Sequence, residues 1–499
     1  MSPRGTPRVA VVGGGITGLS GAYHVSQTRP DVELVLLESR NRLGGNIVTL
    51  REQGFVIDGG PDSFLITKPE GMRLCSELGL QSELIAPESD AAKVYMVHAG
   101  RLERLPAGMV LAVPTRVGPM LRTPILSPAG KLRVLGDLLL RARPAEPARD
   151  DDESISAFIT RHFGAEAAER IAGPLLGGIY AGNIGELSVT ATFPQLVKLE
   201  RQYGSVIRGF FHMQMAGGNG VTNGSPAARP SLAELTHLAS WLRRDEAHRQ
   251  SPFRSLRSGM STLIDTLAAR LPAGSVRLGA PVRAISREAS GRFRIEIESA
   301  TALEVDAVIL AAPAHAAARM LNDAQLGAEL AEIRYESTAT VFFALSRAAV
   351  RHALDGAGFI VPPKKARILA ATWVTSKWAA RAPEGQVLLR AFVGGSLDPE
   401  RVKSSSDEDL VALAYAELER LMGPLGQPSW SRVFRYTDSN PQPTLGHCQR
   451  LRRIERHLQR MPGLYVAGAA YDGVGIPDCI RQGRAAAEKA LRVCSESHK

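Results

Sequence analysis

A glycine-rich segment near the start of the chain has the spacing of a dinucleotide-binding turn. Residues 13–18 read GGGITG, which is the pattern GxGxxG. The segment follows an apolar stretch at Val9–Val12 and precedes apolar residues that recur at helical spacing from Ile16 to Val25. Between a strand and a helix, such glycines let the backbone approach a pyrophosphate, and the helix N-terminus offers free N–H groups to the phosphates. We therefore expect dinucleotide contacts from Gly13, Gly14, Gly15, Ile16, Thr17 and Gly18.

An acidic residue follows at the distance that this turn requires. Glu38 comes directly after a second predicted strand, Val32–Leu37, and 20 residues after Gly18. A carboxylate at this place accepts hydrogen bonds from the adenosine ribose in dinucleotide-binding folds. NAD and FAD both use this geometry, so the turn and Glu38 do not distinguish the two cofactors. An ordinary glycine-rich turn in an α/β protein is the alternative interpretation.

A second signal comes shortly after Glu38. Residues 42–45 read RLGG and residues 58–63 read DGGPDS. A βαβ unit followed by RxGG resembles the FAD-binding amine oxidase and desaturase superfamily. The resemblance implies that the arginine and paired glycines line the pyrophosphate and flavin, and that the second segment turns beside the flavin ring. It gives as further cofactor contacts Ser39, Arg42, Gly44, Gly45, Asn46, Gly60, Pro61, Asp62 and Ser63.

The end of the chain carries another glycine-rich turn. Residues 464–468 read LYVAG, a predicted strand, and residues 473–480 read GVGIPDCI before an alanine-rich helix predicted over Gly483–Leu491. Backbone N–H groups before a helix can face an anionic or electron-accepting ring, here the pyrimidine edge of a flavin. The resemblance adds a backbone contact to adenine and a tyrosine where a flavin-contacting tryptophan is common. The expected contacts are Val282 from the middle of the chain, Tyr436, and, from the segments near its end, Gly468, Val474, Gly475 and Ile476.

Three further stretches narrow the resemblance to one branch of the superfamily. Residues 178–183 read GIYAGN, residues 371–378 read ATWVTSKW and residues 441–447 read PQPTLGH. From about residue 8 to 492 the chain resembles the oxygen-dependent protoporphyrinogen and coproporphyrinogen oxidases, their bacterial members in particular. The resemblance implies noncovalent FAD, a porphyrinogen substrate of haem synthesis, and O2 that takes up six electrons in three two-electron rounds, each forming peroxide.

The same resemblance provides four substrate-binding candidates. Gly178 would lie near the reacting methylene bridge, where the lack of a side chain permits close approach, and Trp378 matches an aromatic residue that stacks on a pyrrole ring. Lys93, which stands where an arginine is expected, and Lys68 are candidates for the propionate carboxylates. The structural alternatives are a helix-terminating glycine, a core tryptophan and surface lysines. We assign no catalytic side chain, because a flavin would carry the chemistry, and we expect no metal.

These signals predict a mixed α/β protein whose cofactor domain is discontinuous. We expect a Rossmann-type FAD-binding domain from residues 1–82, 252–315 and 440–499. A β-sheet substrate domain is expected from residues 83–101, 216–251 and 316–439. An inserted helical domain, which we expect to contact a membrane, is formed by residues 102–215.

Local patterns add detail to this division. Alternation predicts a strand at Phe293–Glu298, an apolar run predicts another at Val305–Leu310, and Asp407–Met422 is typical of an amphipathic helix. Residues 216–231 are rich in glycine, serine, asparagine and proline and predict a surface loop. One helical face is expected to carry Leu132, Leu135, Leu138 and Leu139.

Composition bounds the remaining questions. The chain has 499 residues, of which 44% are hydrophobic and 22% charged, so it can bury a large core. No apolar run approaches the roughly 18–20 residues that span a bilayer. The four cysteines lack CxxC spacing, which argues against a metal site or a disulfide framework and for a reducing compartment. We therefore expect a cytoplasmic protein.

The net charge of +10 suits nucleic acid, an anionic membrane or a carboxylate-rich ligand, but no nucleic-acid motif supports the first. We expect peripheral contact with the inner face of the cell membrane, with Met109–Val113 as an exposed apolar stretch. A homodimer, a transient contact with the next haem-pathway enzyme, and the choice between coproporphyrinogen III and protoporphyrinogen IX stay open, with the excess of arginine favouring coproporphyrinogen III. A flavin amine oxidase or desaturase and a non-catalytic flavin- or porphyrin-binding protein are the other functions that the sequence allows.

Overall fold

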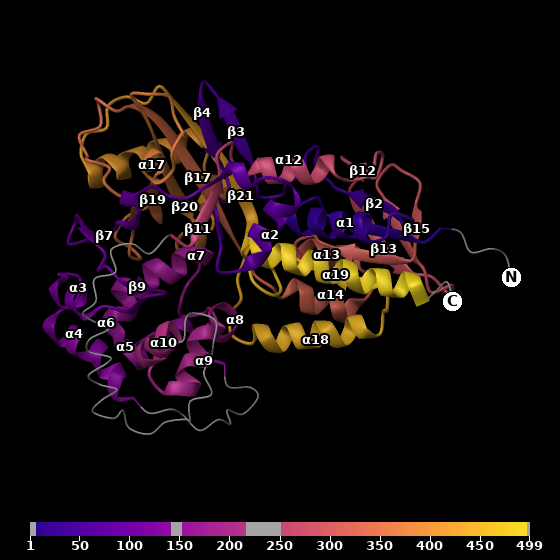
Figure 1. Ribbon diagram of the computed structural model, residues 1–499, viewed down its shortest axis with the longest axis horizontal. Helices are drawn as coiled ribbons and strands as arrows, with labels where there is room; N and C mark the ends of the chain where they lie inside the picture. Colours follow the sequence, from indigo (N-terminus) through magenta and orange to yellow (C-terminus); the bar gives the residue numbers. More distant parts are fainter. Residues whose placement is uncertain (1–5, 141–151, 216–250, 497–499) are drawn as a thin grey trace.

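A five-stranded parallel sheet organises one half of the molecule, which we call the Rossmann half (Figure 1). The computed structural model describes residues 6–140, 152–215 and 251–496. Every neighbouring pair of strands in this sheet is parallel, so the predicted Rossmann-type fold is confirmed. The strands, in sheet order, are β12 (Val276–Arg277), β2 (Glu33–Leu37), β1 (Arg8–Val12), β16 (Ala307–Leu310) and β22 (Leu464–Val466).

Alternate residues of these strands pack into two separate cores. Val9 and Val11 face a core formed with helices α1 (Ile16–Thr28) and α19 (Ile476–Glu496). Val12 faces a second core on the other side of the sheet. Because both faces are buried, the strands read as continuous apolar runs. The covering elements also include α2 (Pro69–Glu77), α12 (Ser261–Ala269), β13 (Val282–Arg287), β14 (Phe293–Ile297), β15 (Leu303–Val305), α13 (Ala314–Met320), α14 (Ala324–Ala331) and α18 (His447–Gln459).

Three boundaries in this half differ from the sequence prediction. The strand expected at Val305–Leu310 is two strands, because β15 pairs with β14 whereas β16 joins the parallel sheet. The helix expected at Gly483–Leu491 already begins at Ile476, with Pro477 in its first turn, where proline is tolerated. The domain boundary expected after residue 315 falls inside α13, whose Ala317 packs into the core beneath the parallel sheet.

A seven-stranded sheet, the large sheet, forms the second part of the fold. All its neighbouring strands are antiparallel except β18 and β7. Helix α17 (Asp407–Met422) packs on one face and has the predicted bounds, with a capping box between Ser406 and Asp409. The strands, in sheet order, are β21 (Trp430–Pro441), β17 (Tyr335–Ser346), β20 (Gln386–Gly394), β19 (Ala370–Trp373), β18 (Gly358–Ile360), β7 (Val94–His98) and β8 (Arg101–Arg104).

Helices dominate residues 117–140 and 152–215, which we call the helical segment. It contains a ten-residue π-helix at Ala168–Gly177, followed by the short helix α7 (Gly178–Tyr180). Its other helices are α3 (Val117–Arg122), α4 (Pro128–Leu135), α5 (Ile155–Phe163), α6 (Ala165–Ala167), α8 (Val189–Thr192), α9 (Pro194–Tyr203) and α10 (Val206–Met215).

Two expectations for this region are wrong. The leucines expected on one helical face do not share it, because α4 ends at Leu135 and both Leu132 and Leu139 are exposed. Residues 109–113 are not an exposed apolar stretch, because they turn between two short strands, β9 (Met109–Val110) and β10 (Val113–Pro114), that leave Val113 buried. The loop predicted at residues 216–231 lies outside the described residues.

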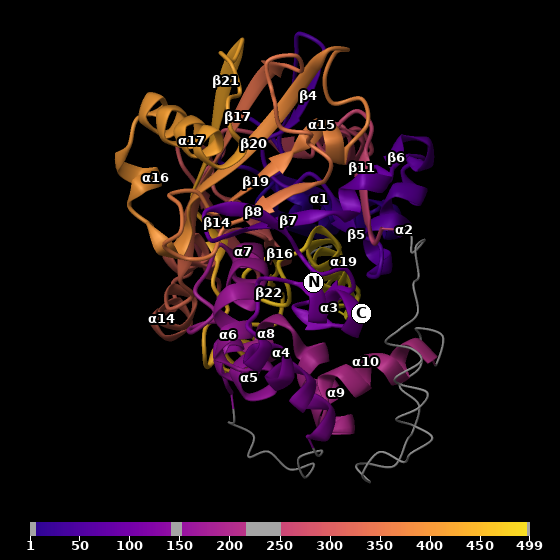
Figure 2. The same cartoon turned by 90° about the vertical axis from the view of Figure 1, so that its left-hand side faces the viewer.

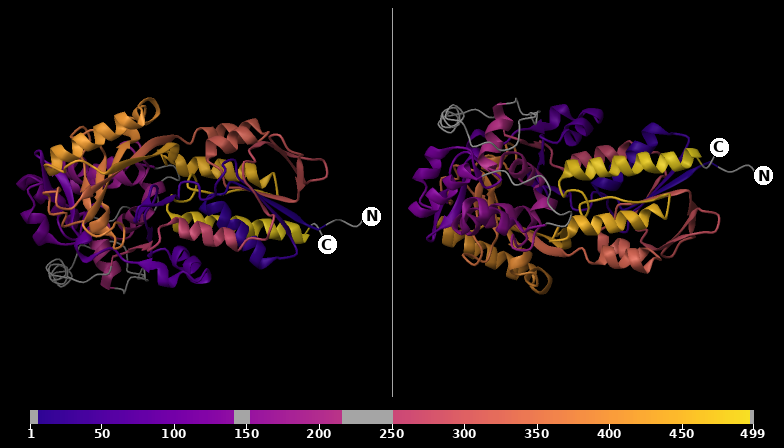
Figure 3. Two further views of the ribbon diagram at one scale, coloured as in Figure 1. Left: turned by 90° about the horizontal axis from the view of Figure 1, so that it is seen from above. Right: turned by 90° about the horizontal axis from the view of Figure 1, so that it is seen from below.

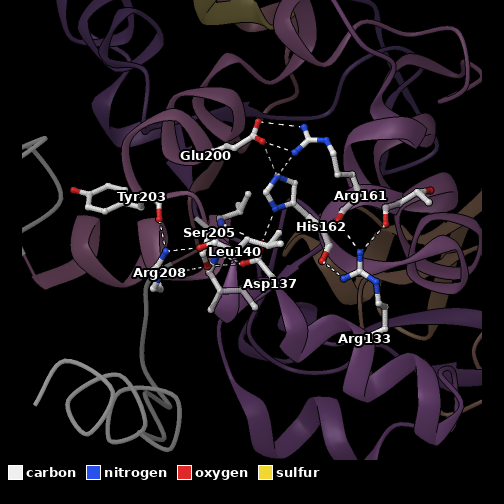
Figure 4. Close-up of polar contacts among 12 residues, drawn as sticks. Arg133, Asp137, Leu140, Arg161, His162, Glu200, Tyr203, Ser205 and Arg208 are labelled. Carbon is white, nitrogen blue, oxygen red and sulfur yellow. Dashed lines mark hydrogen bonds and ion pairs between the residues drawn. The ribbon is translucent and has the colours of Figure 1, made fainter. Parts of the chain in front are cut away.

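A buried cluster of charged side chains holds the helical segment together (Figure 4). His162 is fully buried, with Nδ1 2.5 Å from Asp137 Oδ1 and Nε2 3.4 Å from Glu200 Oε1. Asp137 also accepts a hydrogen bond of 2.6 Å from Ser205 Oγ, and Glu200 pairs with Arg161. The cluster therefore joins the helical turn Gly136–Leu139, α5, α9 and the residue before α10 around one imidazole ring.

The three parts meet around a common centre. Figures 1 and 3 show the Rossmann half at one end of the long axis, and the large sheet and the helical segment together at the other end. Figure 2, viewed along that axis, shows the large sheet above the helical segment. Among the described residues, no helix combines the length and the apolar character needed to cross a bilayer.

Candidate cofactor and substrate site

A cavity of about 830 Å³ lies where the three parts meet. The carboxyl ends of the parallel strands open into it through residues such as Val12 and Leu37, which is where open α/β sheets bind ligands. The large sheet lines it with Thr340 and Phe392, and the helical segment closes it with residues that include Leu175 and Gly178. One continuous space therefore joins the glycine-rich turn to the inner face of the large sheet.

The glycine-rich turn has the close packing that its sequence predicts. An added Cβ at Gly18 would lie 1.9 Å from the carbonyl oxygen of Gly13, so only glycine allows α1 to start this close to β1. Glu38 lines the cavity and is held by two backbone N–H groups, Gly14 N at 2.7 Å and Arg40 N at 2.8 Å. The carboxylate is therefore oriented before any ligand arrives.

Tyr436 provides a test of whether a ligand fits this cavity. Its side chain lines the cavity, and its buried Oη has no hydrogen-bond partner among the described residues. Burial raises the pKa of Tyr436 to about 12, so the hydroxyl stays protonated at neutral pH and can donate. A buried donor without a partner is costly, which fits a ligand that brings an acceptor.

Asp62 is the carboxylate on the wall between the glycine-rich turn and the large sheet. Its Oδ2 accepts from Lys377 Nζ at 2.8 Å and from Trp378 Nε1 at 3.0 Å. Burial alone would raise the pKa of Asp62, but the charges of Lys377 and Arg390 outweigh this effect and hold the pKa below its usual range. The carboxylate therefore stays ionised beside the cavity.

Arg390 is a functional residue that sequence reasoning missed. It lines the cavity from β20, and its Nη2 donates to the carbonyl oxygens of Gly59 and Gly60 at 2.9 and 2.7 Å. Its guanidinium lies over the ring of Phe392, 4.3 Å from the centroid. The available signal was an arginine inside the apolar run VLLRAFV, because a buried cation needs a specific partner.

Most residues predicted to contact the cofactor come together on this cavity. Those on its wall are Gly13, Gly15, Ile16, Thr17, Glu38, Ser39, Gly44, Gly45, Asn46, Gly60, Pro61, Asp62, Val282, Tyr436, Gly468, Val474 and Ile476.

Five predicted contacts do not line the cavity, and each has a structural reason. The N–H of Gly14 is used by Glu38, and Gly18 packs against the turn. Arg42 is exposed and donates to the carbonyl oxygen of Gly45 at 2.8 Å. The Ser63 hydroxyl donates to Asp62, and the N–H of Gly475 donates to Asp478. These residues shape the turns around the cavity and do not form its surface.

Only one of the four substrate candidates faces the cavity. Gly178 lines it, and an added Cβ there would meet no atom within 4 Å. Trp378 differs from the expected stacking residue, because its ring is 1% exposed and packs with Phe55 and Phe342. Neither lysine lines the cavity: Lys68 pairs with Asp478 at 2.6 Å, and Lys93 lies 3.6 Å from Asp355.

The cavity has a polar end and an apolar end. Glu38 and Arg40 lie near the glycine-rich turn, whereas the part between the helical segment and the large sheet is lined mainly by Pro174, Leu175, Ile179, Ile360, Leu369, Ala370 and Phe392. This shape suits a dinucleotide at one end and a flat, apolar molecule at the other. Within residues 6–140, 152–215 and 251–496, no cluster of histidine, cysteine or carboxylate side chains could hold a metal ion.

Comparisons with known proteins agree with this geometry. Residues 16–491 match the family model described as flavin containing amine oxidoreductase. The coproporphyrinogen III oxidase of Bacillus subtilis (strain 168) is 34% identical over 493 residues, which cover 98% of this chain and 98% of that protein. The protoporphyrinogen oxidase of Bos taurus is 31% identical over 502 residues, covering 97% of this chain and 98% of that protein.

A solved structure is similar over the same length. The crystal structure of a protein from Exiguobacterium sp. 255-15, provisionally described as a protoporphyrinogen oxidase, has a TM-score of 0.82 and 32% identity, and the match covers 98% of this chain and 99% of that one. The match to the family model extends over nearly the whole chain. The chain belongs to the flavin-containing amine oxidoreductase family, and its cofactor is FAD.

Proposed function

We propose that the chain oxidises a porphyrinogen to a porphyrin with O2 as the electron acceptor, and that coproporphyrinogen III is its preferred substrate. The observation that carries the proposal is the single cavity that joins a dinucleotide turn to an apolar chamber. The name of the Bacillus subtilis relative, identical at 34% of positions over the full length, supports the substrate.

The Rossmann half would hold the cofactor through residues whose geometry suits each part of it. The backbone at residues 13–17 and the start of α1 would bind the pyrophosphate, and Glu38 would accept from the ribose hydroxyls. Tyr436 Oη would donate to an acceptor on the ligand. When bound, FAD supplies two-electron oxidation, so loss of six electrons from a porphyrinogen takes three rounds.

The remaining walls would bind and orient the macrocycle. Apolar side chains such as Leu175, Ile360 and Phe392 would exclude water from both of its faces, and Gly178 would allow close approach because it has no side chain. The charged side chains on the described wall are Glu38, Arg40, Asp62 and Arg390. Since Arg390 is occupied by backbone carbonyls, the propionates would stay at the mouth of the cavity, where they keep their hydration.

A side-by-side assay tests the proposal. The purified FAD-loaded protein is given coproporphyrinogen III or protoporphyrinogen IX in air, and porphyrin fluorescence and O2 uptake are followed. We expect faster fluorescence with coproporphyrinogen III and about three O2 consumed per macrocycle, because each round transfers two electrons. Oxidation of a simple amine with no action on either porphyrinogen would instead favour an amine oxidase. If none of these substrates bleaches the flavin in a parallel mixture without air, a carrier is favoured.

We also propose peripheral contact with an anionic membrane through the helical segment. Its exposed leucines, Leu121, Leu132 and Leu139, provide the apolar side chains that such contact needs. Flotation with vesicles that contain anionic lipid, at low salt, should recover the protein with the lipid. Replacing the three leucines by serine should abolish recovery; equal recovery of both proteins would refute the contact.

A further inference from the structure

One part of the cavity wall is a short segment that follows an irregular helix. Residues 178–181 provide Gly178, Ile179 and Ala181 to the wall. They follow a π-helix with Pro174 inside it, a rare conformation. Ala181 then adopts a left-handed conformation with φ of 50°. Contacts from outside the segment add to those within it: Ser396 N donates to the carbonyl oxygen of Ala181 at 2.8 Å.

Gln442 makes the side-chain contact that fixes it. Its amide is 5% exposed, and Nε2 donates to the carbonyl oxygen of Tyr180 at 2.8 Å and to that of Asn440 at 3.0 Å. Asn440 lines the cavity at the end of β21, so one amide connects the helical segment to the large sheet. A Cβ at residue 182 would lie 2.2 Å from Gln442 Oε1, which explains why Gly182 follows this wall.

The position of Gln442 is itself fixed by neighbouring backbone bonds. Its own N–H donates to the carbonyl oxygen of Arg334 at 2.8 Å. Next to it, Ser188 N donates to the carbonyl oxygen of Pro443 at 2.9 Å, and Leu445 N donates to that of Glu186 at 3.0 Å. The last two bonds form a seam between residues 442–446 and the helical segment. The amide of Gln442 extends this seam to the cavity wall.

We propose that Gln442 is a positioning residue, which sets the distance between the wall at residues 178–181 and the cofactor and so controls how fast a porphyrinogen reduces the flavin. This inference rests on the proposed function. A displacement of about 1 Å in a reacting pair can lower a rate by about a hundredfold, whereas a small molecule such as O2 needs no such wall. Gln442 should therefore affect one half of the reaction and leave the other unchanged.

Transient kinetics separates the two halves. In Gln442→Met the side chain keeps its volume and loses its donor, and in Gln442→Asn it keeps the donor but falls short of Tyr180. For each FAD-loaded variant, we measure anaerobic flavin reduction by coproporphyrinogen III, and reoxidation by O2 after reduction with dithionite. Reduction should slow by about 10- to 100-fold relative to the wild type, with reoxidation and FAD content unchanged.

Glu186→Gln is the matched control. Glu186 pairs with the exposed Arg334 in the same seam but does not reach the cavity wall, so its variant should reduce at the wild-type rate. Reduction at the wild-type rate in both Gln442 variants would overturn the proposal, as would equal slowing in Glu186→Gln. If Gln442→Met does not retain FAD, Gln442→Asn decides. The wild-type protein is tested first. If no porphyrinogen reduces its flavin, the proposed function itself is refuted, before any variant is compared.

Discussion

Trp378 Nε1 donates a hydrogen bond of 3.0 Å to Asp62 Oδ2, and Asp62 lines the cavity while the indole ring does not. Lys377, the last residue of the short helix α15 (Val374–Lys377), donates to the same carboxylate, and Trp378 follows directly after this helix. Trp378 therefore stabilises the cavity wall from behind through a neighbouring side chain. From the sequence we expected the Trp378 ring to contact the substrate. In the structure its indole N–H instead contacts Asp62, which lines the cavity.

Trp378→Phe should destabilise the protein more than it impairs substrate binding. The phenyl ring still fills much of the space, but the hydrogen bond to a charged acceptor is lost, and such bonds contribute about 1.5–3 kcal/mol. We expect a lower Tm in thermal unfolding followed by flavin fluorescence, and a KM for porphyrinogen close to that of the wild type. A raised KM with an unchanged Tm would instead indicate that Trp378 stacks on the substrate.

The cluster around His162 should make stability depend on pH. Burial lowers the pKa of His162, but its bonds to Asp137 and Glu200 outweigh burial and raise the pKa above its usual value of 6.5. The stabilisation is therefore complete below about pH 6.5 and is lost as the pH rises through the raised folded-state value. The Tm difference between wild type and His162→Gln should be largest near pH 6 and shrink toward pH 9.

At the lower pH, the free energy of unfolding of that variant should fall by about 3–5 kcal/mol, because the buried side chains of Asp137 and Glu200 lose their imidazolium partner. A difference that stays constant across the pH range would show that His162 is neutral in the folded protein.

Two helix glycines should respond differently to the same added methyl group. In Gly18→Ala the new Cβ would lie 1.9 Å from the Gly13 carbonyl oxygen, so the turn must shift, at a cost of about 1–3 kcal/mol. In Gly178→Ala the Cβ enters open space in the cavity. We expect loss of FAD during gel filtration for Gly18→Ala, and normal FAD content with slower porphyrinogen oxidation for Gly178→Ala. Equal FAD retention would mean that the turn does not contact the cofactor.

Tyr436→Phe should weaken FAD binding without destabilising the apoprotein. The lost hydroxyl has no partner among the described residues, so removing it takes no bond from the apoprotein. If FAD supplies the acceptor, its Kd should rise by about 5- to 30-fold, which corresponds to roughly 1–2 kcal/mol. Titration of the apoprotein with FAD measures this, and an unchanged Kd would place the hydroxyl away from the cofactor.

The cofactor site was more predictable from the sequence than the substrate site, for a physical reason. The glycine-rich turn and Glu38 are local: a backbone turn, a helix start and one carboxylate at fixed spacing determine the geometry. Asn46, Gly60 and Pro61 follow 8, 22 and 23 residues after Glu38 and lie on the same cavity.

The substrate wall comes from β18, β20, β21 and the helical segment, whose contacts depend on how distant segments pack. The run VLLRAFV indicates that Arg390 is buried, but no local pattern shows that it bonds to the carbonyl oxygens of Gly59 and Gly60, or that Gln442 reaches Tyr180. Lys68 and Lys93 were expected from type and position alone, and their pairing with Asp478 and Asp355 became visible only in three dimensions.

The order of the parallel sheet also constrains how the protein is made. Strand β22 and helix α19 are synthesised more than 400 residues after β1, yet they complete the sheet in which β1 is the central strand. The nascent chain must therefore keep its N-terminal turn without the fifth strand while more than 400 residues are synthesised, which takes on the order of half a minute at about 5–20 residues per second. FAD capture is thus a late event in biosynthesis, and chains that terminate before Leu464 would lack the elements needed to retain it.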